Sequence, residues 1–247
     1  MFKVPSIKEL HRMMDLMRAV IFPEYSDIDQ SVSIPIFKGV LISQLEVVLD
    51  GSVAETAEKF MDSIPEISRL LHTDVEAITQ NDPAVTDVVE VVLCYPIVTT
   101  MIHYRTAHRL LELGVPRIPR MLTEMAHGAT GIDIHPAAKI GEYFCIDHGT
   151  GVVIGQTCII GNHVMLYQGV TLGAKNFKYD SDGLPIDVPR HPILEDNVTV
   201  YSNTSILGRV TIGHDTVIGG NIWLTHSVPP GSKVVQGKSI EEQLSGK

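Results

Sequence analysis

From Gly131 to Thr157 the chain reads GIDIHPAAKIGEYFCIDHGTGVVIGQT, and this stretch begins a repeat of six residues. One aliphatic residue recurs at every sixth position through most of the second half of the chain. The aliphatic positions are Ile134, Ile140, Ile146, Ile154, Ile160, Leu166, Leu172, Leu194, Val200, Ile206, Ile212, Ile218 and Leu224. Neither an amphipathic helix nor an alternating strand has this period. A hexapeptide repeat is typical of a β-helix, in which each side of a coil is one short strand.

Thirteen hexads are present, and three hexads make one triangular coil, so we predict about four complete coils. The period is interrupted twice. A slip of two residues falls between Ile146 and Ile154, where His148 lies beside flexible glycines. A longer break covers residues 174–192, and its Asp, Gly and Pro content indicates an inserted loop.

The first half of the chain has the pattern of several short helices. Apolar residues recur three and four positions apart, and capping-box spacing to a glutamate occurs three times. The predicted caps are Ser6, Ser52 and Thr73. The last helices before the repeats are expected to cover the first coil, because an uncovered coil exposes its strand edges. We therefore predict an α+β chain. Its parts are a helical N-terminal domain at 1–130, a β-helix domain at 131–235 and a C-terminal tail at 236–247.

The composition of the chain argues against several classes of function. The 247 residues carry a formal net charge of −10 without a cluster of Lys and Arg, which argues against nucleic-acid binding. The three cysteines lack CxxC spacing, and the N-terminus is amphipathic rather than a signal peptide. These features predict reduced thiols, no disulfide, no membrane span and a cytoplasmic protein.

Candidate catalytic residues gather at the two interruptions. His148 follows Asp147 in the slip, and histidine has a pKa suited to general-base catalysis near neutral pH. Arg190 and His191 end the inserted loop, where together they can hold an anionic group of a substrate. The sequence thus favours an enzyme that acts on a small charged substrate.

These residues resemble the serine O-acetyltransferases, a family of hexapeptide acyltransferases. The resemblance runs from about Asp82 to Pro230. It rests on DIHPAAKIG at 133–141, DHGTG at 147–151, GVTLG at 169–173 and RHP at 190–192. It implies a left-handed parallel β-helix with active sites between the subunits of a trimer or of a dimer of trimers. It also implies acetyl-CoA as donor, L-serine as acceptor, O-acetylserine for cysteine biosynthesis as product, and L-cysteine as feedback inhibitor.

The resemblance also implies roles for individual residues. It assigns His148 as the general base and Asp133 as the carboxylate that orients it. Asp82 and Asp147 would bind the ammonium group of serine, and Arg190 its carboxylate. His191 would lie near the developing oxyanion. By alignment, acetyl-CoA would contact Gly173, Ala174, Ser202 and Gly220. No metal is expected. One departure is Gln156, which stands where the family commonly has Glu.

The sequence alone leaves other functions open. Another hydroxy amino acid or a modified serine is the main alternative acceptor. A γ-type carbonic anhydrase, which binds zinc through three histidines between β-helical subunits, and a non-catalytic scaffold are further alternatives. Individual residues also have structural explanations. Asp82 with Pro83 could be a helix N-cap, Asp133 and Asp147 could be solvated turn residues, and Arg190 could be a surface charge.

The predicted tail bears on one partner. Family members that assemble with cysteine synthase insert a terminal isoleucine into the synthase active site. This chain ends in Lys247, and burying an unpaired ammonium group in an apolar pocket is costly. We therefore expect no tight complex with cysteine synthase.

Overall fold

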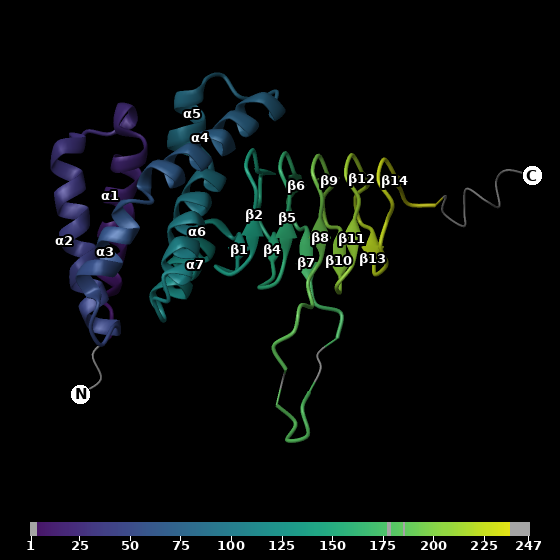
Figure 1. Ribbon diagram of the computed structural model, residues 1–247. Helices are drawn as coiled ribbons and strands as arrows, with labels where there is room; N and C mark the ends of the chain where they lie inside the picture. The colour runs from purple at the N-terminus through teal and green to yellow at the C-terminus, as the bar shows by residue number, and fades with distance from the viewer. Residues whose placement is uncertain (1–3, 177–178, 185, 238–247) are drawn as a thin grey trace, which may run out of the picture.

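The computed structural model describes residues 4–176, 179–184 and 186–237, which form a helical part followed by a solenoid of parallel strands (Figure 1). The helices are α1 (Ile7–Ile21), the 3-10 helix η1 (Pro23–Tyr25), α2 (Gln30–Val48), α3 (Val53–Met61), α4 (Ile64–Asn81), α5 (Val88–Cys94), α6 (Pro96–Glu112) and α7 (Ile118–Thr130). In Figure 1, α1 to α3 lie far from the solenoid, whereas α6 and α7 lie beside its first coil.

The solenoid contains short parallel strands, which confirms the predicted fold class. They are β1 (Asp133–Ile134), β2 (Lys139–Ile140), β3 (Cys145–Asp147), β4 (Val153–Ile154), β5 (Ile159–Ile160), β6 (Met165–Tyr167), β7 (Thr171–Gly173), β8 (Ile193–Leu194), β9 (Thr199–Val200), β10 (Ser205–Leu207), β11 (Thr211–Ile212), β12 (Val217–Ile218), β13 (Trp223–Leu224) and β14 (Lys233–Val234). Sheet 1 has the order β1-β4-β7-β10-β13, sheet 2 the order β2-β5-β8-β11, and sheet 3 the order β3-β6-β9-β12-β14. Each sheet is one side of the left-handed β-helix.

The thirteen aliphatic positions of the repeat are the inward residues of β1 to β13. Along sheet 1, for example, Ile134 pairs with Ile154 and Ile154 with Leu172, and all three are at most 1% exposed. Burying one such side chain stabilises the fold by about 1.5–3 kcal/mol. A fourteenth strand was not predicted, because Val228, which pairs with Ile212 in sheet 2, follows Leu224 by only four positions, so Val234 falls out of the six-residue period.

The long loop leaves the solenoid between β7 and β8 and projects from it (Figure 1). The helical part ends at Thr130, and the first strand begins at Asp133. The division into domains at residues 130 and 131 stays a prediction. Most of the predicted tail, residues 238–247, lies outside the described residues.

The predicted caps are partly correct. Ser6 caps α1, because its hydroxyl accepts a hydrogen bond from the backbone N–H of Glu9 at 3.3 Å. Ser52 precedes α3, but its backbone is left-handed and its side chain makes no capping bond. The prediction for Thr73 is wrong. This residue lies inside α4, which begins nine residues earlier, and its hydroxyl donates to the carbonyl of Leu70. The spacing was therefore a coincidence within one long helix.

Helix α2 is, within the described residues, the one helix long and apolar enough to cross a membrane by length and composition. It packs against α1 and α3 and carries Lys38, whose ammonium group lies 2.7 Å from the carboxylate of Glu58 in α3. These contacts are those of a helix in a bundle, and one such helix is weak evidence for a membrane span. The predicted cytoplasmic location stays a prediction.

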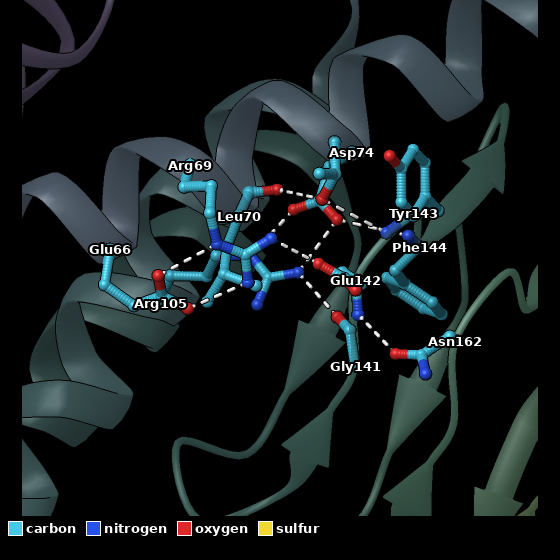
Figure 2. A network of polar contacts seen from close by, with 11 residues as sticks. Glu66, Arg69, Leu70, Asp74, Arg105, Gly141, Glu142, Tyr143, Phe144 and Asn162 are labelled. Carbon is cyan, nitrogen blue, oxygen red and sulfur yellow. Dashed lines mark hydrogen bonds and ion pairs between the residues drawn. The ribbon is translucent and has the colours of Figure 1, made fainter.

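A buried ion pair joins the helices to the first coil (Figure 2). Arg105 of α6 donates to both carboxylate oxygens of Asp74 of α4, at 2.7 and 2.8 Å, and both side chains are less than 5% exposed. Arg105 also donates to the carbonyl of Gly141, and Asp74 accepts from the N–H of Phe144. Gly141 and Phe144 lie in the turn between β2 and β3. The two charged groups therefore form all of these hydrogen bonds only when α4 and α6 pack against the first coil.

The ion pair makes a prediction about stability. We expect Arg105→Ala to lower the free energy of unfolding by about 3–5 kcal/mol, because it leaves the Asp74 carboxylate buried without its countercharge. Chemical denaturation with circular dichroism would measure this loss. Lys59→Ala is the matched control, because Lys59 pairs with Glu55 at 2.7 Å on the exposed face of α3 and such pairs contribute about 0–1 kcal/mol. Equal losses in both variants would contradict the assigned role.

Candidate active site

The predicted site residues fall on two corners of the triangular solenoid. The acidic corner, which joins sheet 3 to sheet 1, contains Asp147 at the end of β3 and His148 directly after it. The loop corner, which joins sheet 1 to sheet 2, contains Arg190 and His191, at the point where the long loop returns before β8. The structure therefore brings together some of the predicted residues and separates others.

His148 lies on a bulge that the sequence marks as the slip in the repeat. Asp147 pairs with Tyr167, but Val153 follows Asp147 by six positions, whereas Thr171 follows Tyr167 by four. The two extra residues lift His148, with a left-handed φ of 57°, out of the wall of the solenoid, and its side chain is 74% exposed.

Gly149 is required for the bulge. Its φ is +90°, and a Cβ atom there would lie 2.5 Å from Cδ1 of Ile132, so a side chain would collide with the core of the first coil. The bulge therefore depends on a residue without a side chain immediately after His148.

A cleft of about 680 Å³ opens between the acidic corner and the helical part. Asp82, Tyr95, Asp147, His148 and Tyr167 are among its lining residues. Asp82 and Tyr95 come from the ends of α4 and α5, and the other three come from the solenoid. Nε2 of His148 lies 3.9 Å from Oδ1 of Asp147. An imidazole and two carboxylates therefore face one cleft, a suitable arrangement for binding a cationic group beside a base.

Asp82 is held in place by local hydrogen bonds. It is the C-cap of α4, and its carboxylate accepts from the Tyr95 hydroxyl at 2.6 Å and from the N–H of Ala84 at 2.8 Å. The bond from Tyr95 is the largest cause that lowers the pKa of Asp82, and it raises the pKa of Tyr95 to about 12. The N-cap explanation of Asp82 is wrong, because α5 begins later and is capped by Asp87.

Tyr95 was missed at the level of sequence. It lies thirteen residues from Asp82 and belongs to no motif, so no spacing rule connects the two. Tyr167 lies on the other side of the cleft and stacks on Tyr201 with ring centroids 4.8 Å apart. The bulky Tyr201 therefore supports a wall of the cleft from the next coil.

At the loop corner, Arg190 is anchored by polar groups. Its Nη2 donates to Oε1 of Gln156 at 2.6 Å, and its Nη1 lies 3.2 Å from Oδ1 of Asp187. Gln156 thus orients the guanidinium group through a neutral amide oxygen. His191 is buried, and burial, reinforced by the charge of Arg190, lowers its pKa to about 4. The corner therefore presents a cation beside a neutral imidazole.

Asp133 points outward from β1 toward α7, where its carboxylate lies 3.7 Å from Nη1 of Arg120. Among the described contacts, no hydrogen bond or ion pair joins Asp133 to His148 of the same chain. Asp133 also lies within 4.8 Å of ligand atoms of Glu124 and His127, a group that could hold a metal ion. Arg120 contacts both carboxylates, however, and its positive charge opposes a second cation there.

The residues expected to contact acetyl-CoA also divide between the corners. Ser202 and Gly220 stack on successive coils at the junction of sheets 3 and 1, where a Cβ atom on Gly220 would lie 3.1 Å from the carbonyl of Ser202. Gly173 ends β7 and Ala174 begins the long loop, so both belong to the loop corner. Their role stays a prediction.

Residues 40–96 match the family model for the N-terminal region of serine acetyltransferases. The chain is 50% identical over 192 residues to a plasmid-encoded serine acetyltransferase of Synechococcus elongatus, a match that covers 77% of this chain and 60% of that protein. It is 39% identical over 186 residues to a serine acetyltransferase of Bacillus licheniformis, covering 72% and 82%.

A solved structure is similar over almost the whole chain. This is serine acetyltransferase 1 of Entamoeba histolytica in complex with L-cysteine, which has a TM-score of 0.84 and 31% identity. The alignment covers 95% of this chain and 88% of that one, so the similarity includes both the helical part and the solenoid.

The bond between Tyr95 and Asp82 makes a prediction about titration. We expect Tyr95→Phe to raise the pKa of Asp82, because the ionised carboxylate loses its strongest hydrogen bond. NMR titration of the Asp82 carboxyl carbon would measure the shift. Tyr201→Phe is the control, since Tyr201 is not among the residues that line the cleft. An unchanged Asp82 titration in Tyr95→Phe would rule out this contact in solution.

Proposed function

Because the chain belongs to the serine acetyltransferase family, we propose that it transfers the acetyl group of acetyl-CoA to the hydroxyl of L-serine. The product would be O-acetylserine, for cysteine biosynthesis. The observation that carries the proposal is the cleft in which His148 faces the carboxylates of Asp82 and Asp147. This cleft offers a base for a hydroxyl group and negative charge for an ammonium group, and serine carries both.

We further propose that each active site is completed by a second copy of the chain. Serine is a zwitterion, so a complete site needs a cation for its carboxylate as well as carboxylates for its ammonium group. Asp82 and Asp147 supply one half at the acidic corner, and Arg190 supplies the other at the loop corner. A trimer in which the acidic corner of one subunit meets the loop corner of the next would place both halves around one serine.

In the proposed reaction His148 takes the proton from the serine hydroxyl while the serine oxygen attacks the thioester carbon. The carbonyl π electrons move to oxygen, which becomes the oxyanion of a tetrahedral intermediate. His191, as a neutral donor, would stabilise that oxyanion. When the intermediate collapses, the C–S bond breaks and the imidazolium of His148 returns its proton to the thiolate of CoA.

Asp133 remains the proposed orienting carboxylate for His148. Since no described hydrogen bond or ion pair joins it to His148, the proposal requires that the exposed imidazole of His148 turn toward Asp133 or that the contact form across the subunit interface. Its neighbour Arg120 would then have to share or release the carboxylate of Asp133. The exposed position of His148 leaves its imidazole accessible to another subunit.

Several details belong to this proposal. Gly173, Ala174, Ser202 and Gly220 would line the path of acetyl-CoA, with contributions from both corners. L-cysteine is a candidate inhibitor, because a related enzyme has been solved with it. Another hydroxy amino acid remains the alternative acceptor, whereas family membership disfavours the carbonic anhydrase and the scaffold.

The role of His148 can be tested directly. We expect His148→Ala to lower kcat by about 10²- to 10⁴-fold with little change in affinity for acetyl-CoA, since the base acts on the acceptor. Release of the CoA thiol in the presence of L-serine would measure the rate. His214→Ala is the matched control, because His214 is an exposed histidine paired with the adjacent Asp215 on another corner. Near-normal turnover in His148→Ala would remove this residue from the mechanism.

The composite site predicts complementation between two inactive variants. Trimers that contain both His148→Ala and Arg190→Ala chains should recover about a third of wild-type activity, because one of the three interfaces in each mixed trimer pairs two intact corners. The mixed trimers would be isolated through two different affinity tags and assayed with serine and acetyl-CoA. Activity no higher than that of the separate variants would show that each site lies within one chain.

A further inference from the structure

The long loop returns to the solenoid on one threonine of the preceding coil. The hydroxyl oxygen of Thr157 accepts hydrogen bonds from the backbone N–H groups of Arg190 and His191, at 2.9 and 3.1 Å. The backbone N–H of Thr157 donates to Nδ1 of His191 at 3.1 Å, and the Thr157 hydroxyl lies 2.8 Å from the same nitrogen. A single residue therefore holds both the backbone and the ring of His191.

These contacts fix the tautomer of His191. Because Nδ1 accepts a hydrogen bond from a backbone N–H, it carries no proton, and a neutral ring must carry its proton on Nε2. The Thr157 hydroxyl then donates to Nδ1 as well. Burial and the neighbouring Arg190, His135 and Arg209 lower the pKa of His191 to about 4, so the ring is neutral at physiological pH. The free edge of the ring is thus an N–H donor.

Two other residues restrict the position of the ring. A Cβ atom on Gly155 would lie 2.0 Å from Cδ2 of His191, so the imidazole lies directly against a backbone without a side chain. The guanidinium group of Arg209 donates to the carbonyls of Thr157 and His191, at 2.7 and 3.0 Å. Arg209 thereby ties the two segments together from the next coil.

We propose that Thr157 is a positioning residue for acetyl transfer, holding His191 so that its Nε2–H is the donor for the developing oxyanion. This inference rests on the proposed function. It extends that function because it explains how a residue on a long loop becomes a fixed donor. A donor aimed at a developing oxyanion stabilises the transition state more than the ground state, so its loss should lower kcat rather than raise KM.

The test compares Thr157→Val with Thr157→Ser. Valine keeps the branched shape but removes the hydroxyl, and serine keeps the hydroxyl. We expect Thr157→Val to lower kcat by about 10- to 100-fold, less than the about 10²- to 10³-fold lost with a whole oxyanion donor. KM for serine and acetyl-CoA should change by less than about threefold. Thr157→Ser should retain most of kcat, and Thr199→Val on sheet 3 is the matched control.

A second measurement needs no substrate and does not depend on the Thr157 variants. Two-dimensional ¹⁵N NMR of histidine-labelled wild-type trimer, with His191→Asn to assign the signal, reports the tautomer of His191. We expect a neutral ring with the proton on Nε2 at pH 7 and titration near pH 4. A proton on Nδ1, or equal loss of kcat in Thr157→Val and Thr157→Ser, would overturn the proposal. If the wild-type protein fails to acetylate serine, the proposed function is wrong. The NMR result would then still show whether Thr157 fixes the tautomer of His191.

Discussion

The ion pair between Asp74 and Arg105 is the constraint on which the candidate site depends. Moving two charges out of water costs several kcal/mol per ion, and this cost is offset only when every remaining donor and acceptor is satisfied. Here the last partners are backbone groups of Gly141 and Phe144 in the first coil. The pair therefore fixes how α4 and α6 sit on the solenoid. Because Asp82 is the C-cap of α4, the same contact also fixes the position of its carboxylate relative to the solenoid.

The sequence was sufficient for features that depend on residues close together along the chain. The six-residue period located the inward residue of every strand from β1 to β13, and the two-residue slip located the bulge that carries His148. Contacts between residues far apart in the sequence could not be predicted from it. No local rule pairs Asp74 with Phe144, 70 residues away, or Thr157 with His191, 34 residues away. The capping pattern at Thr73 failed for a related reason, since a spacing of three also occurs inside a continuous helix.

The two corners also differ in how they hold their side chains. At the acidic corner His148 is exposed on a bulge, and its Nε2 lies 3.9 Å from the carboxylate of Asp147. At the loop corner His191 is buried and bonded on its inner nitrogen. A base must reach its substrate and change protonation state, whereas a donor must keep one protonation state. The environments of the two histidines match these different requirements.

The stacked architecture has a consequence for folding. Most rungs of the solenoid pair residues that are close in sequence, such as Ile154 with Leu172, so each coil can form on the one before it. The exceptions are the three rungs that close over the long loop, which pair Ile160 with Leu194, Leu166 with Val200 and Leu172 with Ile206. Loop-closure entropy grows only slowly with length, by about 0.6 kcal/mol for each doubling. The segment between β7 and β8 can therefore lengthen or shorten during evolution at little thermodynamic cost, provided that the residues that bind Thr157 are kept at its end.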